Sequence, residues 1–152
     1  MEVENRVLLV EAEAPLRRSL EKFLERTGYT FVSCSSAREA LLLVEEFHPD
    51  VVIAEYRLPD SNGVALLEKL KLIVPRAAMI MISEYDFQTV VRELARVDVR
   101  SFLQKPFDLA ELEAAMSLSR AKVKVRFPMK VEWKRELCLE GVPGRPASVF
   151  SK

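Results

Sequence analysis

The chain has 152 residues, 49% of them apolar and 30% charged, which suits one domain of ordinary size with about thirty residues to spare. Its net charge of zero combines net −5 in residues 1–121 with net +5 in residues 122–152, where 8 Lys and Arg accompany 3 Asp and Glu. The acidic start MEVENR argues against a signal peptide and the longest apolar run, AAMIMI, is too short for a membrane span, so we expect a cytoplasmic protein.

Strands and helices alternate from the start of the chain. RVLLV (6–10) is a short continuous apolar run of the kind that forms buried parallel strands. A helix is predicted from Pro15, which suits a first helical turn, to Gly28, which stops it. A second strand, YTFVSC (29–34), then precedes a helix over 36–47 that opens with the capping box Ser-x-x-Glu.

The same alternation continues three more times along the chain. Continuous apolar runs predict three further strands, and helical spacing or capping residues predict three further helices. The strands are 51–54, 78–82 and 100–104, and the helices are 64–73, 86–96 and 108–120. Five such units within about 120 residues indicate an α/β fold: a doubly wound, flavodoxin-like, five-stranded parallel sheet with helices on both faces.

Polar side chains directly follow four of these strands. They are Glu11, Glu55, Ser83 and Lys105, and Pro106 follows the lysine. In doubly wound folds the functional site lies outside the carboxyl ends of the strands, where the strand order reverses. The sequence therefore predicts a site built from these side chains at that edge of the sheet.

Residues 6–120 resemble a response-regulator receiver domain with the CheY-like doubly wound fold. The motifs that carry the resemblance are VLLVEAE, PDVVIAEYRLPDSNG (49–63), MIMIS and FLQKPF. Members of this family accept a phosphoryl group from a histidine kinase onto an Asp after the third strand, with Mg²⁺ held by acids after the first strand. By position, the resemblance assigns Ser83 and Lys105 to binding the phosphoryl oxygens and Phe102 to an aromatic switch that turns inward on activation.

The acidic residues depart from the family pattern. Glu55 stands at the phosphoacceptor position in place of Asp, and Ala12 replaces a carboxylate in the acidic pocket formed by Glu11, Ala12 and Glu13. Glu84 occupies a position on the pocket rim that is normally small. Because Mg²⁺ requires six oxygen ligands in near-octahedral geometry, Glu11 and Glu55 are expected to bind it weakly if at all, and no other cofactor is expected.

Two interpretations of Glu55 remain open. Its side chain is longer than that of Asp and can reach toward Lys105 and Ser83, which would imitate a phosphorylated Asp. The imitation supplies one negative charge where a phosphoryl group supplies about two. In the other interpretation, Glu55 is retained after the loss of phosphoryl chemistry and pairs with Lys105.

The leading hypothesis is a non-enzymatic pseudo-receiver, a two-component signalling module that works through protein contact independently of phosphorylation. Its expected partner surface is the face formed by the fourth helix, the fifth strand and the fifth helix. A histidine kinase and a second copy of the chain are further candidate partners, and no DNA-binding element or membrane contact is expected. The first alternative is a phosphoaccepting response regulator in a phosphorelay.

Residues 122–152 are predicted to be a basic tail, or the start of a truncated second domain, after a receiver domain over 1–121. KVKVRFPMKVEW (122–133) alternates like an exposed strand and is expected to pack on the receiver or to mediate self-association. The tail also resembles the opening of a cyclic-di-GMP-binding PilZ domain, so a fragment of a receiver–PilZ regulator is the second alternative. Cys34 and Cys138 lack metal-ligand spacing and are expected to be reduced thiols.

Overall fold

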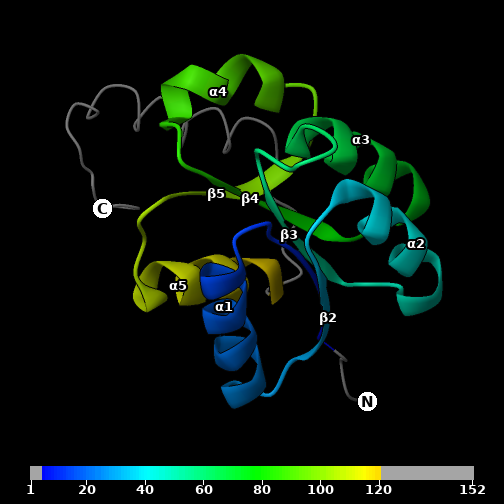
Figure 1. Ribbon diagram of the computed structural model, residues 1–152, viewed down its shortest axis with the longest axis vertical. Coiled ribbons are helices and arrows are strands. Elements are labelled where there is room, and N and C mark those ends of the chain that lie inside the picture. Colours follow the sequence, from blue (N-terminus) through cyan, green and yellow to red (C-terminus); the bar gives the residue numbers. More distant parts are fainter. Residues whose placement is uncertain (1–4, 121–152) are drawn as a thin grey trace.

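The protein is represented by a computed structural model that describes residues 5–120, and within that range five strands alternate with five helices (Figure 1). The strands are β1 (Arg6–Val10), β2 (Thr30–Cys34), β3 (Val51–Glu55), β4 (Ala78–Ser83) and β5 (Val99–Gln104). The helices are α1 (Ala14–Arg26), α2 (Ala37–Phe47), α3 (Gly63–Ile73), α4 (Phe87–Leu94) and α5 (Leu109–Arg120).

The five strands form one parallel sheet in the order β2-β1-β3-β4-β5. Helices α1 and α5 cover one face of the sheet, and α2, α3 and α4 cover the other (Figure 1). From β1 the chain passes to β2 on one side, and it then crosses to β3, β4 and β5 on the other side, so the strand order reverses between β1 and β3. This architecture confirms the predicted doubly wound fold, and it places the expected site above the carboxyl ends of β1 and β3.

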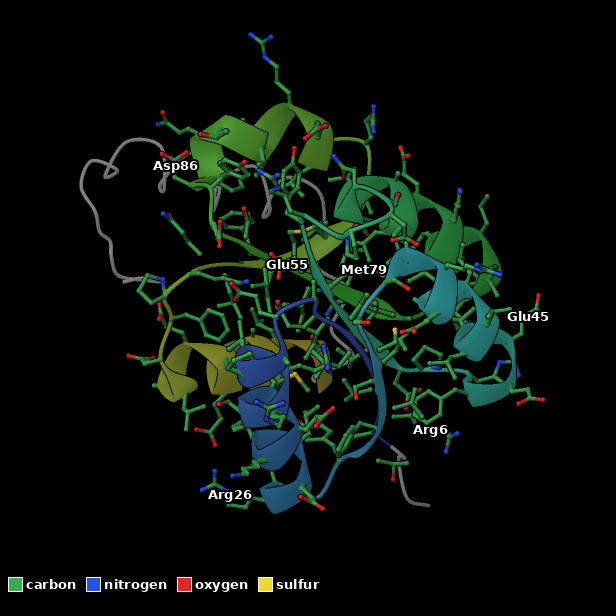
Figure 2. All side chains as sticks on the ribbon, in the orientation of Figure 1. Arg6, Arg26, Glu45, Glu55, Met79 and Asp86 are labelled. Atoms are coloured by element: carbon green, nitrogen blue, oxygen red, sulfur yellow. The ribbon has the colours of Figure 1, made fainter. Side chains whose placement is uncertain are left out.

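In β1, β3 and β4, alternate side chains enter two separate cores. In β1, Leu8 belongs to the core shared with α2, α3 and α4, whereas Leu9 belongs to the core shared with α1 and α5, and both are fully buried. Strands β3 and β4 are buried along their whole length, which explains why their sequences are continuously apolar. Met79 accordingly lies inside the molecule, whereas Glu45 on α2 points outward (Figure 2).

The predicted capping residues start two of the helices. At α5, the Asp108 carboxylate accepts from the Glu111 amide at 2.8 Å, and the Glu111 carboxylate accepts from the Asp108 amide at 2.9 Å. At α2, the Ser36 hydroxyl accepts from the Glu39 amide at 3.2 Å, but the Glu39 carboxylate accepts from the Ser35 amide, one residue before the cap. The contacts to the Glu111 and Glu39 amides satisfy donors that a helix start leaves without intrahelical partners.

The fourth helix is shorter than the predicted range of 86–96. Asp86 is its N-cap, with one carboxylate oxygen accepting from the Thr89 amide at 2.9 Å, and the helix ends at Leu94. The strand boundaries differ from the predicted ones by at most one residue. The sequence pattern therefore located every described element and overestimated the length of one helix.

Residues 122–152, including Cys138, lie outside the described residues, so the predictions of a strand-like tail, self-association and a PilZ fragment stay predictions. Cys34, at the end of β2, is a buried free thiol, and burial raises its pKa to about 11. In the part of the chain from 5 to 120, no helix is both long and apolar enough to cross a membrane.

Candidate functional site

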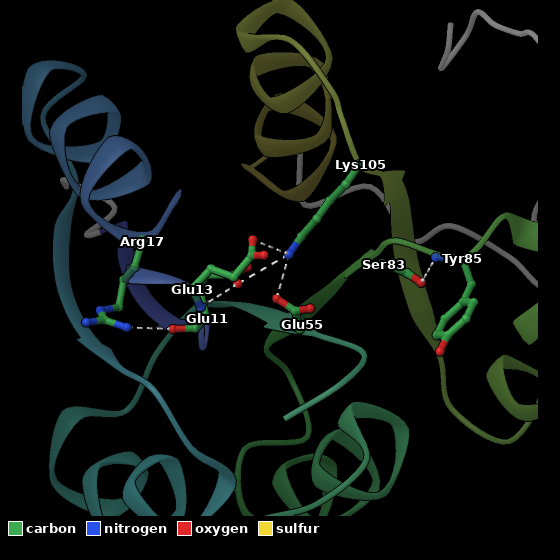
Figure 3. A network of polar contacts seen from close by, with 7 residues as sticks. All are labelled: Glu11, Glu13, Arg17, Glu55, Ser83, Tyr85 and Lys105. Atoms are coloured by element: carbon green, nitrogen blue, oxygen red, sulfur yellow. Dashed lines mark hydrogen bonds and ion pairs between the residues drawn. The ribbon is translucent and has the colours of Figure 1, made fainter. Parts of the chain in front are cut away.

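The carboxyl ends of β1, β3, β4 and β5 meet at one edge of the sheet and bring the predicted site residues together (Figure 3). Glu11 follows β1, Glu55 ends β3, Ser83 ends β4 and Lys105 follows β5. The parallel register pairs Val10 with Ala54, Glu55 with Ile82 and Ser83 with Gln104, so the four site residues leave the sheet within about two residues of one another along the strands.

Lys105 is the centre of an ion network that joins three carboxylates. Its Nζ donates to Glu55 Oε1 at 2.8 Å, to Glu13 Oε1 at 3.1 Å and to Glu11 Oε2 at 3.3 Å (Figure 3). The lysine side chain is only 11% exposed. Burial alone would lower the pKa of Lys105, but the hydrogen bond to Glu55 raises it above its ordinary value, so the ammonium stays charged.

Glu11 is the most deeply buried acid of the site, with no exposed surface. Its Oε2 accepts from the Glu13 amide at 3.1 Å as well as from Lys105, while its Oε1 has no hydrogen-bond partner among the described residues. Burial raises the pKa of Glu11 to about 8, and the neighbouring Glu55 carboxylate adds to the shift. Both effects favour the protonated form of Glu11, whereas the contacts with the Glu13 amide and with Lys105 favour the charged form.

Glu55 makes one of its two expected contacts. It is 5% exposed and pairs with Lys105, as both interpretations of this residue required. Ser83 is fully buried, and its hydroxyl accepts from the Tyr85 amide at 2.8 Å (Figure 3). Among residues 5–120 the hydrogen bonds of Glu55 and Ser83 go to Lys105 and Tyr85 and not to each other, so the expected reach of Glu55 toward Ser83 stays a prediction.

The described residues do not fit a Mg²⁺ ion. Ala12 supplies no carboxylate, burial disfavours the charged form of Glu11, and the ammonium of Lys105 already pairs with Glu55. Within residues 5–120, no group of three or more His, Cys, Asp or Glu side chains is arranged to bind a metal. A divalent cation that requires six oxygens would have to compete with an internal ammonium for the same carboxylates.

The remaining predicted residues lie around this centre. Glu84 is exposed on the rim, directly after Ser83. Phe102 is 4% exposed and points into the core, where its ring packs edge-to-face against Phe87 with centroids 5.4 Å apart. The Lys105–Pro106 peptide bond is cis. The inward position of Phe102 is that of a core aromatic, and whether the ring also acts as a switch stays a prediction.

A second polar network, which the sequence analysis missed, ties the loop after Glu55 to α4. Glu93 on α4 accepts hydrogen bonds from the Tyr56 hydroxyl and, at 3.4 Å, from the Asn62 amide group. The Tyr56 ring packs edge-to-face on Tyr85, whose hydroxyl accepts from Arg57 at 2.6 Å. These contacts link residues about 30 positions apart in the chain without a shared motif, and they hold α4 against the rim of the site.

The start of α3 passes very close to the end of β3. The Gly63 amide donates to the Tyr56 carbonyl at 2.6 Å. A Cβ atom added at Gly63 would overlap the Glu55 carbonyl oxygen and lie 3.0 Å from its carbonyl carbon. Only a residue without a side chain therefore allows this approach of helix and strand.

Comparison with known proteins matches residues 7–117 to the family described as "Response regulator receiver domain". The chain is 30% identical over 126 residues to the regulatory protein AtoC of Escherichia coli, covering 80% of this chain and 27% of AtoC. It is 28% identical over 113 residues to the chemotaxis protein CheY of Thermotoga maritima, covering 74% of this chain and 94% of that CheY. The match thus spans nearly all of that CheY and about a quarter of AtoC.

Solved structures show the same fold at lower sequence identity. Chemotaxis protein CheY4 of Vibrio cholerae superposes with a TM-score of 0.71 at 20% identity, covering 76% of this chain and 98% of CheY4. The signal receiver domain of an HD domain-containing protein from Pseudomonas fluorescens gives 0.73 at 24% identity, covering 78% and 96%.

Proposed function

Because the chain belongs to the response regulator receiver domain family of two-component signalling, we propose that it is a pseudo-receiver, which signals through protein contact and not through phosphoryl transfer at Glu55. The observation that carries this proposal is the 2.8 Å ion pair between Glu55 and Lys105. In this ion pair, Glu55 at the acceptor position and Lys105, which the family resemblance assigns to binding the phosphoryl oxygens, are already bound to each other.

An incoming phosphodonor would meet three obstacles in this pocket. It would have to separate Glu55 from Lys105, reach a carboxylate that is only 5% exposed, and approach past the exposed acid Glu84. Two like charges about 4 Å apart repel by about 4 kcal/mol at an effective dielectric near 20. A Mg²⁺ ion would normally offset such repulsion, and the described residues do not fit one.

We infer that output passes through a protein partner on the face formed by α4, β5 and α5. Helix α5 exposes two leucines, Leu109 (52%) and Leu118 (45%), at separate positions, and either can contribute an apolar contact to a partner. A histidine kinase or a second copy of the chain remains a candidate occupant of this face. In this proposal the protein acts by binding and is not an enzyme.

Labelling with acetyl phosphate tests the proposal. We expect intact-mass measurement of the full chain to show no stable phospho-adduct, because the acceptor carboxylate is buried and paired. The matched control is the double variant Glu55→Asp with Ala12→Asp, which places Asp at the acceptor position and adds the missing acid, and it should label. A substantial adduct mapped to Glu55 in the unchanged chain would favour the working phosphoacceptor instead.

Magnesium binding provides a separate measurement. We expect a dissociation constant for Mg²⁺ of about 1 mM or weaker, because Lys105 competes for the carboxylates and Glu11 must lose a proton first. Amide NMR titration with MgCl₂ would measure it, and Ala12→Asp should strengthen binding by about tenfold. Sub-millimolar affinity centred on Glu11 and Glu55 in the unchanged chain would contradict the expectation.

A further inference from the structure

A groove of about 350 Å³ is lined by residues of α2, of α3 and of the loop that precedes α3. These two helices lie at the right of the view, away from α5 (Figure 1). Helix α2 contributes Arg38, Leu41 and Leu42, helix α3 contributes Leu66 and Lys69, and Asp60 from the preceding loop lines one end. On α2, Arg38 precedes Leu41 by three positions, and on α3, Lys69 follows Leu66 by three positions. The two residues of each pair therefore lie on the same face of their helix.

Three leucines supply most of the apolar lining of this groove. Leu66 is 1% exposed and forms part of the core, Leu41 is half-buried, and Leu42 is 73% exposed beside them. Leu42 and Leu41 together extend the apolar surface of Leu66 outward into the groove. A bound apolar side chain would extend the surface that Leu41 and Leu66 already bury.

The charges of the groove are unbalanced. Asp60, the only acidic residue among the described lining residues, accepts from the Ala37 and Arg38 amides at 2.9 and 3.0 Å, which lowers its pKa. Its carboxylate is thus committed to the start of α2. Arg38 and Lys69 are exposed, and neither forms an ion pair with a carboxylate among residues 5–120.

We propose that the α2–α3 groove docks an acidic amphipathic segment of a partner protein. The apolar side chains of that segment would enter between Leu41, Leu42 and Leu66, and its carboxylates would pair with Arg38 and Lys69. Charge complementarity selects this occupant, because residues 122–152 of the chain itself carry net +5 and would be repelled by the same two cations. The proposal does not depend on the chemistry of Glu55.

Selection from a random peptide library against the full chain tests this proposal. A displayed library of peptides about 16 residues long can form the two or more helical turns that a groove between helices accepts. We expect enriched peptides to carry Asp or Glu beside two apolar residues at helical spacing, and to shift the amide resonances of α2 and α3 when titrated.

Substitutions of groove residues show where the enriched peptides bind. Leu42→Glu and Lys69→Glu are each expected to weaken the enriched peptides by about tenfold or more, because each removes a lining group and adds repulsion. The matched control is Leu72→Glu, at an 86% exposed position on α3 outside the groove, which should leave affinity unchanged. Thermal unfolding of each variant checks that the fold is retained.

Three results would overturn the proposal. The first is no enrichment, or enriched peptides that are basic or whose resonance shifts lie away from α2 and α3. The second is equal binding by Leu42→Glu and the unchanged chain. The third is self-association of the full chain that Leu42→Glu abolishes, because a second copy would then be the occupant.

Discussion

Replacing Lys105 by Met is expected to lower the free energy of unfolding by about 3 kcal/mol, which corresponds to a melting temperature about 10 °C lower. The lysine is 11% exposed and pairs with Glu55 and Glu11, which are themselves almost completely buried. Removing the ammonium leaves these carboxyl groups in the interior without a cation. Methionine keeps most of the apolar side chain, so the loss reports on charge more than on packing.

The stability deficit of this variant should depend on pH. Glu11 has a pKa of about 8 in the folded protein and 4.5 as a reference, so the folded state holds a proton that the unfolded state has lost between these values. The free energy of unfolding therefore falls as pH rises through this window. Because the charge of Lys105 opposes the rise of this pKa, its removal steepens the fall at the upper end.

Urea unfolding at about pH 5 and about pH 8.5 measures both effects. We expect the larger difference between Lys105→Met and the unchanged chain at the higher pH. Glu13→Gln is the matched control, because it removes a pair whose acid is 53% exposed and should cost about 0–1 kcal/mol. Equal stability of Lys105→Met and the unchanged chain at both pH values would show that the network does not stabilise this edge of the sheet.

Replacing Gly63 by Ala is expected to lower the free energy of unfolding by about 3 kcal/mol or more. The added Cβ would collide with the main chain of Glu55 and lie 3.0 Å from the Cα of Tyr56, and main-chain atoms in a buried strand cannot rotate away. Relief requires α3 to move outward from β3, which loses packing in the core that Val64 and Leu67 share with the sheet. Thermal or urea unfolding measures the loss.

Gly28→Ala is the matched control for this effect. Gly28 has φ +87° after α1, with no atom within 4 Å of an added Cβ, so Ala there meets conformational strain but no collision. We expect it to cost about 1–2 kcal/mol, less than Gly63→Ala. The reverse order of stabilities would mean that α3 adjusts without loss and that the close approach to Glu55 is unimportant.

The fold was largely predictable from apolar runs and capping residues. Strands at 51–54 and 78–82 read as continuous apolar sequence because parallel strands covered on both faces need apolar side chains on both. The end of α4 was not predictable in the same way. Residues after Leu94 keep a composition suited to a helix, and the chain turns there because Val97 packs into the core ahead of β5.

The residues that form the site were predictable from the sequence, but their hydrogen-bond partners were less so. Parallel strand ends must meet at one edge, so Glu11, Glu55, Ser83 and Lys105 follow from strand positions alone. Which partner each side chain selects depends on the loop main chain. The Ser83 hydroxyl bonds to the Tyr85 amide, and Glu93 bonds to Tyr56 from 37 positions away, and neither contact leaves a pattern in the sequence.

The position of Lys105 in the chain also bears on how long the folded state lasts. Its three carboxylate partners precede it by 50, 92 and 94 residues, and it follows the strand at the edge of the sheet. Contacts that close such long loops are expected to form late, after the transition state for folding has been crossed. Lys105→Met should therefore speed unfolding while leaving the folding rate nearly unchanged, which stopped-flow measurements can separate. The ion network would then slow the unfolding of the native state without increasing the rate of folding.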